Sequence, residues 1–171
     1  MNKTSVREQI LARLRAELDR QTRAAELSRD EAIDEHSQPE NRWDTHSQEA
    51  AYLAEGQARL VKDIGESIEL YQTLPLPDFA NGDAIALGAL VELDAGGNRS
   101  SYFVGPRGGG IEFELDGRNV LVLTPQSPLG RELVGRRAGD LVRLPGRTEP
   151  ARIVSIAEPT AAVSPALRGR G

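Results

Sequence analysis

The sequence contains no cysteine, and only 4% of its 171 residues are aromatic. The absence of cysteine excludes a disulfide-stabilised scaffold and a thiolate metal site, and it is compatible with a reducing cytosol. The scarcity of aromatic residues means that the core must be built mainly from Leu, Ile, Val and Ala. With this length, the chain has room for one or two small domains.

Long apolar runs are also missing. The N-terminal stretch MNKTSVREQILARLRAELDRQ carries charges throughout and has no uninterrupted apolar segment of the kind that signal peptides contain. No run approaches the ~20 apolar residues that a membrane-spanning helix needs. We therefore expect a cytoplasmic protein without membrane contact. The net charge of −5 argues against a protein that coats nucleic acid with its whole surface.

Proline and glycine are rare in only one half of the chain. Residues 1–74 contain one proline and two glycines, whereas the rest of the chain holds nine prolines and fifteen glycines. This change of composition predicts a helical N-terminal region and a C-terminal domain at 82–158. Between them, Pro75 and Pro77 prevent a helix from continuing, so 75–81 is the predicted linker.

Apolar residues of the first half recur in two stripes at helical spacing. The first stripe consists of Val6, Ile10, Leu14 and Leu18, and the second consists of Leu53, Leu60, Ile64, Ile68 and Tyr71. Thr4 or Ser5 is the expected N-cap of the first helix. Pro39 is expected early in the second helix, where its missing N–H has little effect.

The two stripes predict an antiparallel helical hairpin. If Leu14 faces Ile64, the midpoint of the pairing falls at residue 39, where the sequence has a proline. Leu18 facing Leu60 gives the same midpoint. Each arm of about 33 residues would be roughly 50 Å long. Because such a hairpin has a thin core, it needs a partner domain or supercoil packing to fold well.

The second half has the pattern of strands separated by Gly, Asn and Asp turns. The expected strands are 85–96, 100–105, 111–115, 120–125, 141–145 and 151–157. Turn signals lie at 95–98 and 116–117, and only 127–137 looks helical. The predicted fold class is therefore α+β, with a helical hairpin followed by a small antiparallel sheet and one short helix. The tail 159–171 lacks periodicity and is expected to be disordered.

Charge is concentrated in two regions. Residues 30–44, at the predicted hairpin tip, carry six acids and one arginine, whereas residues 127–152 carry six arginines and three acids. Tip acids are compatible with simple solvation near helix ends. Clustered carboxylates can also help to hold Mg²⁺, which takes oxygen ligands and needs only one or two protein carboxylates. At the end of a stalk they could assist two-metal phosphoryl chemistry in the active site of a partner.

Other candidate sites have little support. His36 and His46 lack the spacing of a metal motif, so we expect surface histidines. The triple glycine at 108–110 lacks the Lys and Ser/Thr of a nucleotide-binding P-loop, which favours a flexible hairpin loop. No serine has a histidine partner in a hydrolase pattern.

The segment 127–140 resembles a known family signature. Its residues Ser127-Pro128-Leu129-Gly130-Arg131, then Leu133, Gly135 and Gly139-Asp140, are similar to the C-terminal domain signature of Gre-type (GreA/GreB) transcription elongation factors. In that family the signature forms a helix and turn inside an FKBP-like sheet. Glu40-Asn41, Glu55-Gly56 and Lys62-Asp63-Ile64 resemble parts of the second coiled-coil helix of the family.

Local physics gives the same motif a structural role. Pro128 can begin a short helix, and Leu129 and Leu133 fall on one face of it, toward the sheet. Gly135 is expected to end the helix, and Gly139 to permit the turn into the next strand. The motif therefore predicts a piece of the domain, and the function comes from the resemblance alone.

The resemblance implies an accessory factor rather than an enzyme. Gre-type factors bind bacterial RNA polymerase through the C-terminal domain and insert the coiled coil into the secondary channel. There the tip carboxylates help to position the second Mg²⁺ and a water, and the polymerase cuts its own backtracked RNA. This implies no cofactor of its own, Mg²⁺ supplied by the polymerase, contact with the nascent RNA 3′ end only inside the complex, and a monomer. The implied polymerase-binding residues are Ser127, Pro128, Leu129, Gly130, Arg131, Gly135 and Arg136.

The tip departs from the family pattern Asp-x-x-Glu-Asn. Here Glu40 matches the glutamate, whereas Ser37 stands at the aspartate position. We expect Glu40 and Asp44 to be the assisting carboxylates that share Mg²⁺ in the polymerase complex, with Asp34 and Glu35 as alternates. This departure leaves open a channel-binding regulator or inhibitor without cleavage activity.

Two further alternatives come from other classes of protein. One is an FKBP-like peptidyl-prolyl isomerase with a helical arm. It needs a concave aromatic lining, for which 82–157 offers only Tyr102, Phe103 and Phe113. The other is a structural coiled-coil protein without a channel target, which would dimerise through its stripes.

Overall fold

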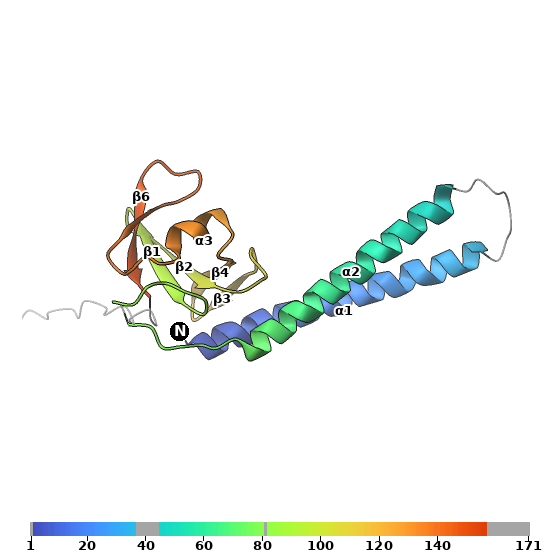
Figure 1. Ribbon diagram of the computed structural model, residues 1–171, viewed down its shortest axis with the longest axis horizontal. Coiled ribbons are helices and arrows are strands. Elements are labelled where there is room, and N and C mark those ends of the chain that lie inside the picture. Colours follow the sequence, from blue (N-terminus) through green and yellow to red (C-terminus); the bar gives the residue numbers. More distant parts are fainter. Residues whose placement is uncertain (1, 37–44, 81, 157–171) are drawn as a thin grey trace, which may run out of the picture.

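The protein consists of a long helical hairpin attached to a six-stranded sheet (Figure 1). The computed structural model describes residues 2–36, 45–80 and 82–156. The elements in chain order are α1 (Lys3–His36), α2 (Thr45–Thr73), β1 (Leu90–Ala95), β2 (Asn98–Val104), β3 (Glu112–Leu115), β4 (Arg118–Leu123), α3 (Pro128–Leu133), β5 (Leu141–Arg143) and β6 (Pro150–Ser155). The predicted α+β architecture is confirmed. No helix in these ranges is long and apolar enough to cross a membrane.

The base of the hairpin, which is the half next to the sheet, packs through the predicted stripes. The buried side chains are Val6, Ile10 and Leu14 on α1 and Ile64 and Tyr71 on α2. The cap of α1 differs from the prediction, because the backbone N–H of Thr4 donates to Oδ1 of Asn2 (2.9 Å). Asn2 therefore caps the helix in place of Thr4 or Ser5. The expected position of Pro39 lies outside the described residues.

The distal half of the hairpin leaves apolar residues exposed. Leu53 and Leu60, which the second stripe placed inside, are 58% and 41% exposed. The prediction fails there because α1 has no buried apolar side chain between Leu18 and Asp30, and Leu27 is itself 65% exposed. Its partly buried residues in that region include Gln21 and Thr22, which are polar.

The sheet has the order β3-β4-β2-β1-β6-β5. Four of its pairings are antiparallel, as the sequence predicted for the sheet, whereas β2 and β4 pair in parallel. The connection 105–111 causes this difference, because it carries the chain past the position of β4 to the edge strand β3. Strand β4 then returns between β3 and β2.

Both predicted tight turns are present. Gly96 and Gly97 have φ of 64° and 88°, and Oδ1 of Asp94 accepts the N–H of Gly97 at 2.7 Å. In the second turn Asp116 and Gly117 have φ of 53° and 70°. Positive φ at both central residues matches the right-handed twist of the strands on either side.

Two element boundaries differ from the prediction for one shared reason. The first strand begins at Leu90 instead of 85, and α3 ends at Leu133 instead of 137. The N–H of Gly135 donates to the carbonyl of Ile85 (2.8 Å), and the N–H of Ile85 donates to the carbonyl of Arg136 (2.8 Å). Ile85, in the segment before β1, thus forms backbone hydrogen bonds with the residues that follow α3. Neither local sequence pattern could indicate this pairing.

Each face of the sheet has its own core. On one face, Leu90, Phe103, Phe113, Val120 and Val122 form a cluster with the buried residues of the hairpin base. On the other face, strand residues such as Val91, Leu93 and Val104 pack against Leu129 and Leu133 of α3. The hairpin therefore gains from the sheet the partner surface that its thin core requires.

Polar contacts reinforce the joint between hairpin and sheet. Oη of Tyr71 donates to the carbonyl of Arg107 (2.6 Å), and Nη2 of Arg107 lies 3.1 Å from Oε2 of Glu66. Burial raises the pKa of the Tyr71 hydroxyl, so it remains a protonated donor. The triple glycine belongs to this same connection. The predicted flexible hairpin loop is therefore wrong, because 105–111 joins β2 to β3, which do not pair with each other, and packs on α2.

The segment between α2 and β1 is packed against the base of α1. Nζ of Lys3 donates to the carbonyl of Pro77 and lies 3.6 Å from Oδ1 of Asp78. It also lies 5.3 Å from the centroid of the Phe79 ring. Leu74 is buried. The tail 159–171 lies outside the described residues.

Candidate functional site

The expected tip carboxylates have no described geometry. Glu40 and Asp44 lie outside the described residues, and Asp34 and Glu35 are placed only as backbone positions near the end of α1. Among the residues that the structure describes, no three His, Asp or Glu side chains gather in a metal-binding arrangement. A shared Mg²⁺ at the tip remains a prediction.

The resemblance motif forms a capped turn of helix. Oγ of Ser127 accepts the N–H of Gly130 (3.0 Å) and donates to the carbonyl of Thr124 (2.8 Å). Pro128 follows at the first helical position, where a missing N–H costs nothing. Leu129 and Leu133 are buried toward the sheet, as predicted.

The remaining motif residues shape the backbone that follows. Gly135 and Gly139 have φ of 84° and 94°, a region that residues with a Cβ rarely adopt. The N–H of Gly139 donates to the carbonyl of Ile153 (2.8 Å), and Oδ2 of Asp140 accepts the N–H of Arg137 (2.9 Å). Gly135 follows the C-cap Val134, so α3 ends before this glycine as the motif predicted, although the pattern over 127–137 placed the end later. Much of the motif therefore builds the fold.

A few motif residues stay at the surface. Pro128, Arg131 and Arg136 are exposed. Nε of Arg131 donates to the carbonyl of Gln126 (3.0 Å), and this hydrogen bond holds the guanidinium group against the turn before α3. Of the residues expected to bind polymerase, these three and the half-buried Ser127 have accessible side chains, whereas Leu129 and Gly130 are buried.

A groove of about 350 Å³ lies beside the N-terminus of α3. Three of the expected residues line it, Ser127, Pro128 and Leu129, whereas Arg131, Gly135 and Arg136 do not. The rest of its lining includes Tyr102, Leu121, Leu144, Pro145 and Arg147. The motif thus contributes one wall of a mostly apolar groove that carries an arginine, and this combination suits a protein partner.

Tyr102 and Arg147 were not singled out as site residues by the sequence. The pattern SSYFVG contained the signal, because adjacent strand residues point to opposite faces. Tyr102 consequently lines the groove, whereas Phe103 is fully buried in the core shared with the hairpin, and Phe113 is 2% exposed there. The groove therefore holds only one of the three aromatics that an isomerase pocket could have used.

Ser127→Ala is expected to lower the free energy of unfolding by about 1 kcal/mol, because the start of α3 loses its side-chain acceptor. Urea denaturation followed by circular dichroism measures the change. Ser127→Thr is the matched control, since it keeps the hydroxyl. An unchanged midpoint in Ser127→Ala would show that the cap contributes nothing.

Comparisons with known proteins give weak matches to solved structures. No protein-family model matches the chain, and no curated protein matches it significantly. GreA factor homolog 1 (Gfh1) of Thermus thermophilus is 22% identical over 85% of this chain and 92% of its own, with a TM-score of 0.34. A second structure, described as the transcription factor Gfh1, is 23% identical over the same shares, with a TM-score of 0.34. Gfh1 of Thermus aquaticus is 21% identical over 84% of this chain and 91% of its own, with a TM-score of 0.33.

Proposed function

We propose that this protein is a Gre-type accessory factor of bacterial RNA polymerase. Its sheet domain binds the polymerase, and its hairpin enters the secondary channel, with Glu40 and Asp44 at the tip. There the tip carboxylates assist the polymerase in cutting backtracked RNA. The factor is not an enzyme by itself, acts as a monomer, and meets the nascent RNA 3′ end only inside the complex.

The observation that carries this proposal is the contrast between the two halves of the hairpin. The base is buried in a core shared with the sheet. The distal half exposes Leu27, Tyr52 and Leu53 by 65%, 74% and 58%. Large apolar side chains exposed on both helices of this half favour contact with another macromolecule. A helix of 34 residues is about 50 Å long at 1.5 Å per residue, so α1 suits insertion into a deep channel.

The groove beside α3 is the proposed contact with the polymerase surface. Ser127, Pro128 and Leu129 form one wall, and Tyr102 supplies a ring with a polar end. Tyrosine and arginine are enriched at protein interfaces. Because Arg147 also lines the groove, we expect the matching polymerase surface to carry an acidic residue.

The chemistry at the tip belongs to the polymerase complex. Mg²⁺ held there would activate the attacking water and stabilise the charge on the RNA phosphate that is cut. Glu40 and Asp44 would contribute carboxylate oxygens, which are the ligands that Mg²⁺ prefers. The local charge of residues 30–44, six acids and one arginine, supports this role.

Glu40→Ala combined with Asp44→Ala is expected to abolish cleavage stimulation and to leave polymerase binding unchanged. The assay uses a stalled, backtracked elongation complex with labelled RNA and Mg²⁺, and it measures shortened transcripts and binding in parallel. Glu8→Ala with Glu69→Ala is the matched control, because these two acids are exposed near the hairpin base. Loss of binding in the tip variant would contradict the proposed division of labour.

The departure at Ser37 favours one alternative, a channel-binding regulator that lacks cleavage activity. In that case the native protein would shorten no transcripts but would compete with a cleavage factor for the polymerase. If the protein showed neither cleavage nor competition, the remaining interpretation would be a coiled-coil protein without a channel target. Dimerisation in solution would support that outcome.

A further inference from the structure

A second cavity, of about 710 Å³, lies where strands β2 and β4 separate. The parallel pairing of these strands begins at Ser101 and Val120. Before that point the two strands pair only with their outer neighbours. Their first residues line the cavity, together with Glu92 of β1: Arg99, Ser100 and Ser101 from β2, and Arg118 and Asn119 from β4. None of these residues belongs to the resemblance motif.

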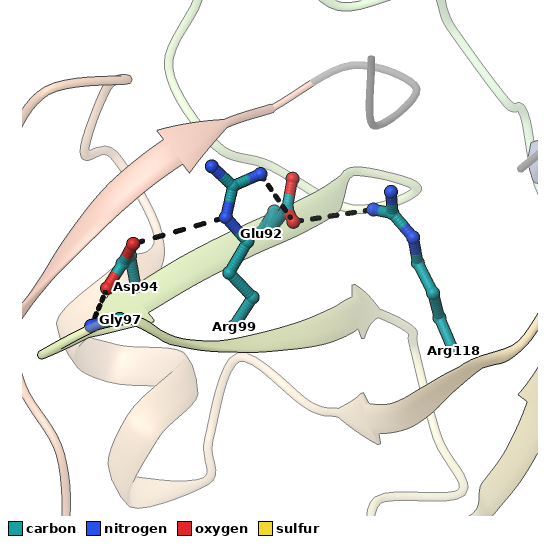
Figure 2. Close-up of polar contacts among 5 residues, drawn as sticks. All are labelled: Glu92, Asp94, Gly97, Arg99 and Arg118. Atoms are coloured by element: carbon teal, nitrogen blue, oxygen red, sulfur yellow. Dashed lines mark hydrogen bonds and ion pairs between the residues drawn. The ribbon is translucent and has the colours of Figure 1, made fainter. Parts of the chain in front are cut away.

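One buried carboxylate holds two guanidinium groups in this cavity (Figure 2). Glu92 is 5% exposed, and its Oε1 lies 3.4 Å from Nη1 of Arg99 and 3.3 Å from Nη1 of Arg118. The two arginines come from different strands and approach the carboxylate from two sides. Nε of Arg99 also lies 4.0 Å from Oδ2 of Asp94, whose other oxygen accepts the N–H of Gly97.

The arginines keep donors for a further ligand. A guanidinium has five N–H groups, and the contacts to Glu92 are long and use one nitrogen of each arginine. Oε1 of Glu92 is a polar partner of the Arg118 side chain. The side chains of Arg99 and Arg118 are 54% and 29% exposed, so solvent reaches both.

The set of donors indicates the class of ligand. Besides the two arginines, the cavity is lined by Ser100, Ser101 and Asn119. Ser101 pairs with Glu92, so its hydroxyl lies on the same face of the sheet as the arginines. A carboxylate has two oxygens and is satisfied by one guanidinium fork, whereas a phosphate monoester has three terminal oxygens and can accept from both arginines and a hydroxyl. The second carboxylate of the lining, Glu112, accepts from the Asn119 amide and is exposed.

The volume exceeds what an inorganic phosphate ion fills and falls in the range of small-molecule sites. Tyr102 and Leu121 also line the cavity and offer apolar surface. We propose that the cavity binds the phosphate monoester of a small organic molecule, with its phosphate between Arg99 and Arg118. Its organic part extends through the gap between β2 and β4 toward Tyr102 and Leu121, which point to the other face of the sheet. Binding at this site needs no polymerase, although the cavity shares Ser100, Tyr102 and Leu121 with the groove beside α3.

The test uses the full chain with adenosine 5′-monophosphate, inorganic phosphate and adenosine as probes in isothermal titration calorimetry at low salt. We expect saturable binding of the nucleotide, weaker binding of phosphate and no measurable binding of adenosine. Arg99→Gln and Arg118→Gln should each weaken nucleotide binding by about tenfold, because each removes charge-assisted hydrogen bonds. Each single variant leaves Glu92 with one guanidinium partner, and circular dichroism checks that it folds.

Arg143→Gln is the matched control, since Arg143 is an exposed arginine on β5 that does not line the cavity. If Arg143→Gln weakened nucleotide binding as much as the cavity variants do, the effect would come from the loss of positive charge in general. That result would overturn the proposal. Nucleotide binding that persists in the Arg99→Gln, Arg118→Gln double variant would also overturn it, as would failure of the native protein to bind at millimolar nucleotide. Equal affinity for phosphate and nucleotide would reject the organic part of the proposal.

Discussion

Phe103→Ala is expected to lower the free energy of unfolding by about 3–5 kcal/mol and to loosen the helices together with the sheet. Phe103 is fully buried near the C-terminal end of β2. It belongs to the cluster that contains Val6 and Ile10 of α1 and Tyr71 of α2. A cavity at this position removes contacts from both parts of the protein at once.

Hydrogen exchange with mass spectrometry distinguishes shared from separate loss of structure. Amide protection should fall in the base of α1 as well as in β2 and β4, because one core connects them. Phe103→Leu is the control that keeps most of the volume, and Leu87→Ala removes a side chain that is 42% exposed. Loss of protection confined to the strands would mean that the hairpin base is stable without the sheet.

The sequence predicted the elements well where the pattern was local. The stripes Val6, Ile10, Leu14 and Ile64, Tyr71 lie inside as expected. The central residues of the two tight turns, Gly96-Gly97 and Asp116-Gly117, also have the positive φ that their positions required. These features depend on spacing within a helix or on conformational freedom at a single residue, and both are visible without knowledge of the partner strand.

Features that depend on distant residues could not be predicted. The parallel pairing of β2 with β4 requires the 105–111 connection to pass over a strand that follows it in sequence. The exposure of Leu53 depends on what α1 offers opposite it, which the periodicity of α2 alone does not show. The end of α3 depends on backbone hydrogen bonds to Ile85, fifty residues earlier.

The candidate site shows the same limit. The motif at Ser127 to Leu129 was found because its residues are contiguous, and it forms one wall of a groove. The strand alternation at 100–105 indicated which way Tyr102 points, but nothing local to Tyr102 or Arg147 showed that they share a groove with the motif. Likewise, Glu92 gathers Arg99 from seven residues away and Arg118 from twenty-six residues away. Only the arrangement of the strands brings these three charges together.

Gly105→Ala is expected to damage the joint between hairpin and sheet. A Cβ on Gly105 would lie 2.0 Å from Oη of Tyr71 and 3.2 Å from Cγ1 of Val122. The backbone N–H of Gly105 donates to the carbonyl of Leu123 (2.8 Å), so the strand end is not free to move away. The Tyr71 ring must then shift and lose its bond to the Arg107 carbonyl. We expect a loss of about 3 kcal/mol in the free energy of unfolding.

Tyr71→Phe supplies the second side of a double-mutant cycle. Alone it should cost about 1–2 kcal/mol, because it leaves the Arg107 carbonyl without its hydroxyl donor. In the Tyr71→Phe background the oxygen at 2.0 Å is absent, and the nearest remaining side-chain atom is Cζ at 3.0 Å. The double variant should therefore lose less stability than the sum of the single losses, by about 1–2 kcal/mol.

Urea denaturation of the four proteins in this cycle measures the coupling between Gly105 and Tyr71. Gly56→Ala is the matched control, because nothing lies within 4 Å of a Cβ at this position in α2. It should raise stability by about 0.5–1 kcal/mol, since alanine favours a helix interior over glycine. Additive losses at Gly105 and Tyr71 would mean that a strand movement accommodates the added methyl group at position 105, and that the tyrosine hydroxyl does not fix the hairpin to the sheet.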